Sequence, residues 1–244
     1  MNNPIIEIKN FSRRYNDGFL AVNNISFNVY KGQFHCFIGS NGSGKTTTIK
    51  AIINASLFFD GEILIGGHKN SSIQAKKLIG YIPETSNFPV NFNVEKFLYA
   101  FGLLSGFSKK QTIAKRDKIV EELNIKDLLK KNPNNLSSGQ KKKVMLAQCL
   151  IDDSEIIIMD EPTTNLDPLA RKELLETLSN LVKKGKTIFI STHNLSEVTK
   201  YADSVTIIEK SKLIYSGSTN NQDMETLYIN KIKEYEEKNN QKII

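Results

Sequence analysis

The sequence contains few cysteines and histidines, and it has no long apolar run. Its 244 residues include two cysteines and three scattered histidines, a composition that argues against a structural zinc site. Cys36 and Cys149 lie in apolar segments, which predicts buried free thiols in a reducing compartment. No apolar run approaches the ~20 residues that a membrane-spanning helix requires.

Several other features are also absent. Residues 1–4 lack the basic and apolar layout of a signal peptide, so we expect a cytosolic protein that reaches any membrane through a partner. The net charge of +7 comes from dispersed lysines. They have no aromatic side chains between them, which favours solvated faces over binding to phosphates or an anionic membrane, and we expect no nucleic-acid partner.

The length and the ordinary 39% hydrophobic content allow one large domain or a core with a subdomain.

What the sequence does contain is a glycine-rich phosphate-binding pattern. Residues 39–46 match G-x-x-x-x-G-K-[ST], the pattern of a P-loop, with an apolar strand expected before them and a helix expected over 46–53. Lys45 would reach the β- and γ-phosphates, and the Thr46 hydroxyl would ligate Mg²⁺. The flanking elements disfavour the alternative, a glycine-rich turn with a chance lysine. The predicted nucleotide contacts here are Gly39, Ser40, Asn41, Gly42, Ser43, Gly44, Lys45, Thr46 and Thr47.

A second element combines a strand with two acids. Four apolar residues, 156–159, precede Asp160 and Glu161. A buried strand that ends at Asp160 can place a carboxylate beside the Mg²⁺ of a P-loop nucleotide, and Glu161 could hold the attacking water. An ordinary strand with an acidic turn is the alternative. The P-loop upstream favours the functional interpretation.

A third element starts a helix. Residues 136–140 read Leu-Ser-Ser-Gly-Gln and lie at the start of a helix expected over 138–150. Small residues at a helix start can bind a second phosphate, although they are equally typical of a plain cap.

The pattern of apolar residues predicts an α/β core interrupted by helices. We expect a helical subdomain between about residues 84 and 152, in which Ser108 caps a helix to Leu123 with Ile113, Ile119, Val120 and Leu123 on one apolar stripe. The tail, 220–244, is charged and is expected to be peripheral. The expected strands cover 5–8, a strand pair over about 21–29, 33–38, 60–67, 79–82, 156–159, 187–190 and 205–208, and the expected helices also cover 94–105 and 168–184.

In this order, the elements resemble the nucleotide-binding subunits of ATP-binding cassette (ABC) transporters over about residues 5–217. Residues 39–46 resemble the Walker A motif, Asp160 and Glu161 resemble Walker B with its catalytic glutamate, and residues 136–140 resemble the family signature, usually LSGGQ. The resemblance implies an α/β fold with a P-loop NTPase core of the ABC type, an N-terminal antiparallel β-subdomain and an inserted α-helical subdomain.

The resemblance also implies domain limits. The ATP-binding domain would span 5–230, with its core over 5–83 and 153–217 and its helical subdomain over 84–152. Residues 218–244 would form a charged C-terminal extension.

Four further positions gain roles only through this resemblance. Tyr15 would stack on adenine, and His193 would donate a hydrogen bond to the γ-phosphate, making it catalytic together with Lys45 and Glu161. Asp167, in the D-loop, would act across a dimer interface, although Asn-Leu-Asp-Pro also predicts a helix cap. Glu84 would occupy the Q-loop. The implied magnesium ligands are Thr46, Glu84 and Asp160.

In the family, two cassettes pair head-to-tail and sandwich ATP between one P-loop and the partner's signature. Ser137, Ser138, Gly139 and Gln140 would therefore contact ATP bound by the opposite subunit, in a homodimer or a heterodimer. Two departures matter. Ser138 stands where the family usually has glycine, and Glu84 stands where it usually has glutamine. Backbone N–H groups remain available at the first position, and glutamate at the second resembles ATPases of bacterial ABC-2-type exporters.

The resemblance implies an ATPase subunit on the cytoplasmic face of the membrane that powers a separate membrane permease, with ATP and Mg²⁺ as cofactors. The alternative is a soluble mechanical ABC ATPase acting on DNA or the ribosome. Repair types carry a long coiled-coil insertion where about ninety residues separate P-loop and signature here, and translation types carry two cassettes per chain. A P-loop kinase would leave the signature, the D-loop and His193 unexplained. The transported substrate and the direction of transport stay open.

Overall fold

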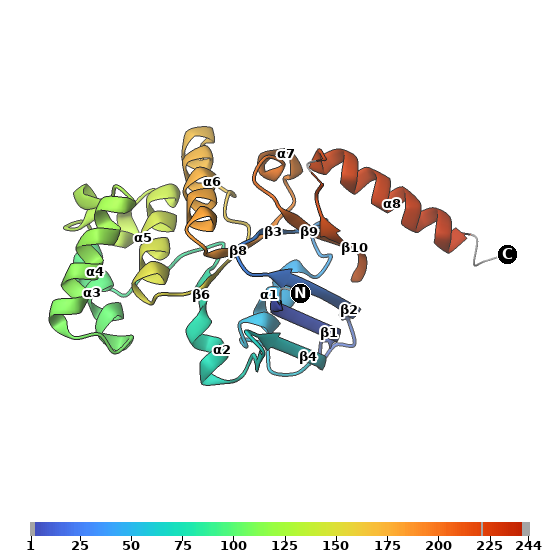
Figure 1. Ribbon diagram of the computed structural model, residues 1–244, viewed down its shortest axis with the longest axis horizontal. Helices are drawn as coiled ribbons and strands as arrows, with labels where there is room; N and C mark the ends of the chain where they lie inside the picture. The colour runs from blue at the N-terminus through green and yellow to red at the C-terminus, as the bar shows by residue number, and fades with distance from the viewer. Residues whose placement is uncertain (1–2, 221, 241–244) are drawn as a thin grey trace.

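Two β-sheets form the centre of the molecule. The computed structural model describes residues 3–220 and 222–240. The first sheet has four antiparallel strands in the order β2-β1-β4-β5, and the second has six in the order β10-β9-β3-β8-β7-β6. In the second sheet all neighbouring strands are parallel except β10, which runs antiparallel to β9. The expected N-terminal antiparallel β-subdomain and α/β core are confirmed (Figure 1).

The strands and helices have the following limits. The strands are β1 Pro4–Arg14, β2 Leu20–Tyr30, β3 Phe34–Ile38, β4 Asp60–Ile65, β5 His68–Lys69, β6 Ile79–Ile82, β7 Ile156–Met159, β8 Thr187–Thr192, β9 Ser204–Glu209 and β10 Lys212–Ser218. The helices are α1 Lys45–Ile52, α2 Ile73–Leu78, α3 Val94–Leu104, α4 Lys109–Glu122, α5 Ser138–Ile151, α6 Pro168–Lys183, α7 Leu195–Val198 and α8 Met224–Asn240, with 3₁₀ turns η1 Lys126–Leu128 and η2 Pro133–Asn135.

The strand period of two divides the interior into two cores. On β7, Ile157 and Met159 face a core shared with α5 and α6, whereas Ile156 and Ile158 face a core shared with α1 and the first sheet. All four side chains are fully buried. This is the pattern expected of a parallel strand covered on both faces.

Helices α3, α4 and α5 gather beside the six-stranded sheet (Figure 1). Ser108 caps α4 with a complete capping box, as the sequence predicts. The predicted stripe is wrong at one position, because Ile113 is 42% exposed while its neighbour Thr112 is fully buried. Gly102 on α3 explains the change: a Cβ there would lie 2.4 Å from Thr112 Cγ2, so the glycine permits a close approach at Thr112.

Other differences from the sequence prediction involve the edges. The expected strand pair at 21–29 is one continuous strand, β2, and β5, α2 and β10 were not predicted. The tail is not entirely peripheral, because Met224 and Leu227 in the first turns of α8 are 0% and 5% exposed. The C-terminal part of α8 extends beyond the sheets on the side opposite α3 and α4 (Figure 1).

The parallel strands place the predicted motifs at one edge. The P-loop follows β3, Glu84 follows β6, Asp160 follows β7 and His193 follows β8. Neighbouring parallel strands end at the same edge of a sheet, which is where α/β folds bind ligands. Within the described residues, none of the helices has the length and apolar character to span a bilayer.

Candidate functional site

A pocket of about 530 Å³ opens at the carboxyl edge of the parallel strands. Predicted residues from the P-loop, the Q-loop and the acidic strand meet in it, together with three positions that were not predicted: Phe19, Ala21 and Thr164. Its lining comprises Phe19, Ala21, Asn41, Gly42, Gly44, Lys45, Thr46, Thr47, Glu84, Glu161, Thr164 and His193.

The P-loop needs its glycines because neighbouring backbone lies very close. A Cβ on Gly39 would lie 2.0 Å from the main-chain oxygen of Ile208. Gly44 has a φ of 110°, and a Cβ there would lie 2.6 Å from the oxygen of Ala21. Gly44 also precedes α1 without any side-chain cap. The first N–H groups of α1 are therefore free of a capping side chain and point toward the loop, as an anion site at a helix start requires.

Lys45 is buried in the pocket and is held from two sides. Its ammonium donates hydrogen bonds to the main-chain oxygens of Gly39 at 2.8 Å and Ser40 at 3.2 Å. The same nitrogen lies 3.4 Å from Oε1 of Glu161, and the two side chains are only 6% and 11% exposed. The structure thus brings together the predicted phosphate-binding lysine and the predicted catalytic glutamate.

Ser191 at the end of β8 joins the two acids. Its hydroxyl donates to Oδ1 of Asp160 at 2.6 Å and accepts the N–H of Glu161 at 2.9 Å. Glu161 has a φ of 45°, a left-handed conformation that is uncommon for glutamate and that concentrates at functional sites. Ser191 was not predicted as a site residue, and its place two residues before His193 is the only signal in the sequence.

His193 lies on the other side of Glu161. Its Nδ1 is 2.9 Å from Oε2 of Glu161, and the imidazole is about half exposed. Glu161 is therefore flanked by Lys45 and His193, one at each carboxylate oxygen. Such an arrangement can orient a carboxylate toward a water molecule and present an imidazole to an anion.

Glu84 lines the pocket, and its main chain is held by a lysine of α5. Lys142 on α5 is 3% exposed, and its ammonium donates to the main-chain oxygens of Pro83 and Glu84. Burial lowers the pKa of Lys142 to about 8, against the charges of Glu84 and Asp160, which raise it. Burial, with the charges of Asp160 and Glu84, also raises the pKa of Tyr81 to about 12, so this phenol stays neutral.

Tyr15 lies beside the pocket and does not line it. Its hydroxyl is 3.0 Å from Oγ1 of Thr47, and the Arg13 guanidinium lies 5.1 Å from the centre of its ring. Phe19, which is 55% exposed, lines the pocket itself. Two aromatic side chains therefore flank the P-loop, and the sequence prediction named only the first.

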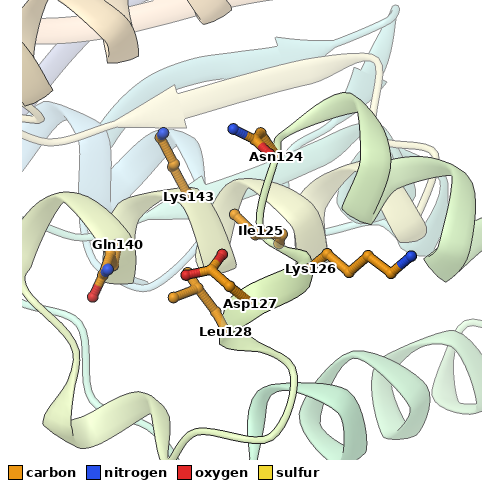
Figure 2. A pocket seen from close by; sticks show the side chains of 7 residues that line it. All are labelled: Asn124, Ile125, Lys126, Asp127, Leu128, Gln140 and Lys143. Atoms are coloured by element: carbon orange, nitrogen blue, oxygen red, sulfur yellow. The ribbon is translucent and has the colours of Figure 1, made fainter.

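The signature residues do not line the P-loop pocket. Ser137 caps α5 with a complete capping box, and Ser138 donates to the main-chain oxygen of Asn165 at 2.6 Å. Asp167 caps α6 by accepting the N–H of Ala170 at 2.9 Å, which confirms the predicted helix cap. Gln140 lines a separate cavity of about 680 Å³ between α5 and the 124–128 segment. Figure 2 shows its side chain there, together with those of Asp127 and Lys143.

The residues of the pocket fit a nucleotide with a divalent cation. Among the described residues, two of the buried polar atoms that have no hydrogen-bond partner belong to this region: Ser43 Oγ in the P-loop and Glu161 Oε1 in the pocket, which has only its ion contact with Lys45. Polar atoms are therefore available for a ligand. Within the same residues, no group of three or more acidic, histidine or cysteine side chains converges on a metal position. Mg²⁺ typically uses one or two carboxylates together with phosphate oxygens, and this donor set suits that mode of binding.

Comparison with known proteins agrees with this geometry. Residues 22–164 match the family model described as ABC transporter. A putative ABC transporter ATP-binding protein of Mycoplasma pneumoniae is 42% identical over 223 residues, covering 89% of this chain and 68% of the relative. A Nod factor export ATP-binding protein I of Burkholderia lata is 33% identical over 215 residues, covering 87% of this chain and 70% of the relative.

A third relative and two solved structures extend the comparison. The energy-coupling factor transporter ATP-binding protein EcfA of Methanocaldococcus jannaschii is 34% identical over 220 residues, covering 88% of this chain and 79% of the relative. The structure of an ATP binding subunit of an ABC transporter superposes with a TM-score of 0.83 at 28% identity, over 93% of this chain and 99% of that one. The structure of cbiO1 from Clostridium perfringens, part of the ABC transporter complex cbiONQ, gives 0.81 at 25% identity, over 94% and 93%.

Proposed function

This chain belongs to the ABC transporter family of ATP-binding subunits, and we propose that its P-loop pocket is the site at which ATP is bound and hydrolysed. The family activity is ATP hydrolysis coupled to transport, so the chain is an ATPase subunit that powers a membrane transporter. A soluble mechanical ATPase acting on DNA or the ribosome is not favoured, because the relatives named above are transporter subunits.

The observation that carries the proposal is the position of Glu161 between Lys45 and His193. Phosphate oxygens bound at the α1 N-terminus would compete with Glu161 for the Lys45 ammonium. Glu161 would then be free to orient and deprotonate the attacking water. His193, at the opposite carboxylate oxygen, would donate to the γ-phosphate. The roles of the predicted site residues rest on this arrangement.

A magnesium ion would complete the site. Thr46 and Glu84 line the pocket, and Asp160 is held at the end of β7 by Ser191. We propose these three residues as direct or water-mediated ligands. When bound, Mg²⁺ would neutralise charge that develops on the transferred phosphoryl group.

The signature and D-loop would serve a second subunit. In a single chain, residues 137–140 at the start of α5 and Asp167 at the cap of α6 do not line the P-loop pocket. We therefore propose a head-to-tail dimer, with a second copy or a related cassette, in which these residues reach the ATP of the opposite P-loop. The domain limits predicted from the sequence remain part of this proposal.

The partner would be an integral membrane permease at the cytoplasmic face, and the transporter would be an exporter. Glu84 in the Q-loop favours export, and one group of relatives is named for Nod factor export. A relative of similar identity is named for an energy-coupling factor transporter and not for export. The proposed direction of transport therefore rests mainly on Glu84. Identifying the membrane protein that co-purifies with the chain from its native cells tests the partner and, through its substrate, the direction.

The catalytic proposal is tested with Glu161→Gln. The amide cannot accept a proton, so most ATP turnover should be lost while ATP binding is kept, and ATP-bound dimers should accumulate. Glu176→Gln, on the exposed side of α6 beside Lys172, is the matched control and should hydrolyse ATP like the wild type. Turnover of the Glu161→Gln protein at the wild-type rate would rule out Glu161 as the base.

A further inference from the structure

Glu209 contacts the P-loop from the strand next to β3. It is the last residue of β9, and β9 pairs with β3 in parallel. The hydroxyl of Ser40 donates to Oε1 of Glu209 at 2.9 Å, and the N–H of Ser40 donates to Oε2 at 3.3 Å. Both donors of one P-loop residue are therefore held by one carboxylate.

Ser40 in turn touches the phosphate-binding lysine. Its main-chain oxygen accepts a hydrogen bond from the Lys45 ammonium at 3.2 Å. A shift of Ser40 would change both the path of the loop and an acceptor of Lys45. Two consecutive contacts thus connect Glu209 to Lys45, although Glu209 does not line the pocket.

The C-terminal helix holds Glu209 from the other side. The hydroxyl of Tyr228 on α8 donates to Oε2 of Glu209 at 3.1 Å. Burial, together with the Glu209 charge, raises the pKa of Tyr228 to about 12, so the phenol stays a donor at neutral pH. The start of α8 is fixed by its buried Met224 and Leu227 and by the N–H of Met224, which donates to Thr199 at 3.3 Å.

We propose that Glu209 is a positioning residue for the P-loop and that Tyr228 anchors it, so that helix α8 sets the affinity of the site for ATP. The contacts run from Tyr228 to Glu209, then to Ser40 and Lys45. This inference rests on the proposed function, because it takes the P-loop pocket to be the ATP site. It gives the C-terminal extension a role that the family motifs do not supply.

A second route from α8 to the site leads to a different prediction. Tyr228 and Ile229 also line a cavity of about 390 Å³ with His193 and Leu195. An effect through His193 would lower kcat, because His193 would act on the γ-phosphate during hydrolysis. An effect through Glu209 and Ser40 would weaken ATP binding in the ground state and transition state alike, raising KM at constant kcat.

The experiment compares Tyr228→Phe with Tyr215→Phe in the full-length protein. Tyr215 lies beside α8, but its hydroxyl donates to the main-chain oxygen of Ser218, so the control removes one tyrosine hydroxyl without touching Glu209. We expect Tyr228→Phe to raise the Kd and KM for ATP by about threefold to tenfold at unchanged kcat. The change is modest because Tyr228 contacts Glu209 and not the P-loop, so only part of the free energy of this charge-assisted hydrogen bond affects ATP binding. Tyr215→Phe should match the wild type. A wild-type Kd in Tyr228→Phe, or a fall in kcat alone, overturns the proposal.

A double-mutant cycle assigns the effect to Glu209. In a Glu209→Ala background, Tyr228→Phe should cause no further change in Kd, because the shared partner is gone. Ser40→Ala, which removes one of the two Ser40 donors, should raise the Kd in the same direction as Tyr228→Phe. An equal effect of Tyr228→Phe with and without Glu209 overturns the proposal.

A further variant separates this inference from the proposed function. Lys45→Ala is measured in the same titrations. If the wild type binds ATP and Lys45→Ala does not, the site is established, and a wild-type Kd for Tyr228→Phe rejects only the role of α8. If the wild type and Lys45→Ala bind ATP equally, the proposed site itself is rejected.

Discussion

The ammonium of Lys142 donates a hydrogen bond of 2.7 Å to the main-chain oxygen of Glu84. Lys142 belongs to α5, the helix that begins with the signature residues, and Glu84 follows β6 of the parallel sheet. A buried cation thus joins the helical subdomain to the segment at the mouth of the pocket. Because this bond uses the main chain of Glu84, it leaves the Glu84 carboxylate free for the site.

The titration of Lys142 predicts a pH dependence of stability. Burial lowers the pKa of Lys142 from 10.5 to about 8, so between these values the unfolded chain binds more protons at this side chain than the folded chain does. The contribution of this group to stability should therefore rise with pH across that window. In Lys142→Met the rise should be smaller, as measured by denaturant midpoints from about pH 8 upward. The exposed Lys110→Met is the control. Identical pH profiles of stability for Lys142→Met and the wild type would contradict the lowered pKa of Lys142 in the folded protein.

The sequence predicts those parts of the fold that depend on local signals. The P-loop, the capped helices α4 and α6 and the buried strands β3 and β7 all follow from turn chemistry and apolar runs. The expected strand pair at 21–29 is a single strand, β2, because β1 pairs with it along its whole length. Strand pairing is a long-range property that residues 21–29 do not contain.

The remaining differences arise from contacts between distant segments. Thr112 is buried in place of Ile113 because Gly102, on another helix, allows the close approach. The site itself shows the same limit. The acidic strand end predicts Glu161 and the family resemblance implies His193, but Ser191 joins two acids only because β7 and β8 are neighbours. Glu209 is likewise brought to Ser40 by the pairing of β9 with β3.

The aromatic residues beside the P-loop should contribute to nucleotide affinity. Stacking on a base is worth about 1–3 kcal/mol, so Tyr15→Ala should weaken ATP binding, while Tyr15→Phe should lose only the contact with Thr47. Phe19 lines the pocket, so Phe19→Ala should also weaken binding. Fluorescent-nucleotide titration measures all three variants. An equal loss in Tyr15→Ala and Tyr15→Phe would show that the hydroxyl, and not the ring, is responsible.

The Glu84 side chain should matter more for coupling than for binding. In the family, the Q-loop lies beside the permease contact, and here the Glu84 backbone is held by Lys142 independently of its carboxylate. Glu84→Ala should reduce permease-stimulated hydrolysis and transport more than ATP affinity. Glu84→Gln, which restores the residue usual in the family, should retain most coupling. These rates are measured in the reconstituted complex, and unchanged transport and hydrolysis in Glu84→Ala would refute this role.

The shared site can be tested by mixing two inactive proteins. If Lys45 serves ATP within its own chain and Gly139 serves the ATP of the opposite subunit, Lys45→Ala and Gly139→Asp each break both sites of their own homodimer. A mixed dimer combines both lesions in one site and leaves the other intact. Mixing should restore ATPase activity, to at most about half of the wild-type level per mixed dimer if one site can turn over alone. Wild-type specific activity should also rise with protein concentration if the active species is the proposed dimer.

Two controls make the mixing experiment decisive. A Cβ on Gly139 would lie 3.1 Å from Cβ of Ala170, so the thermal midpoint of Gly139→Asp must first show that the protein is folded. A tagged pull-down with ATP then shows that mixed dimers form. If they form and no activity returns, either the two sites must fire together or the signature does not act across the interface. The ATPase rate of the Gly139→Asp homodimer distinguishes these two explanations. Gly139 does not line the pocket of its own chain, so a wild-type rate in this homodimer would show that the signature does not act on the ATP of the opposite subunit.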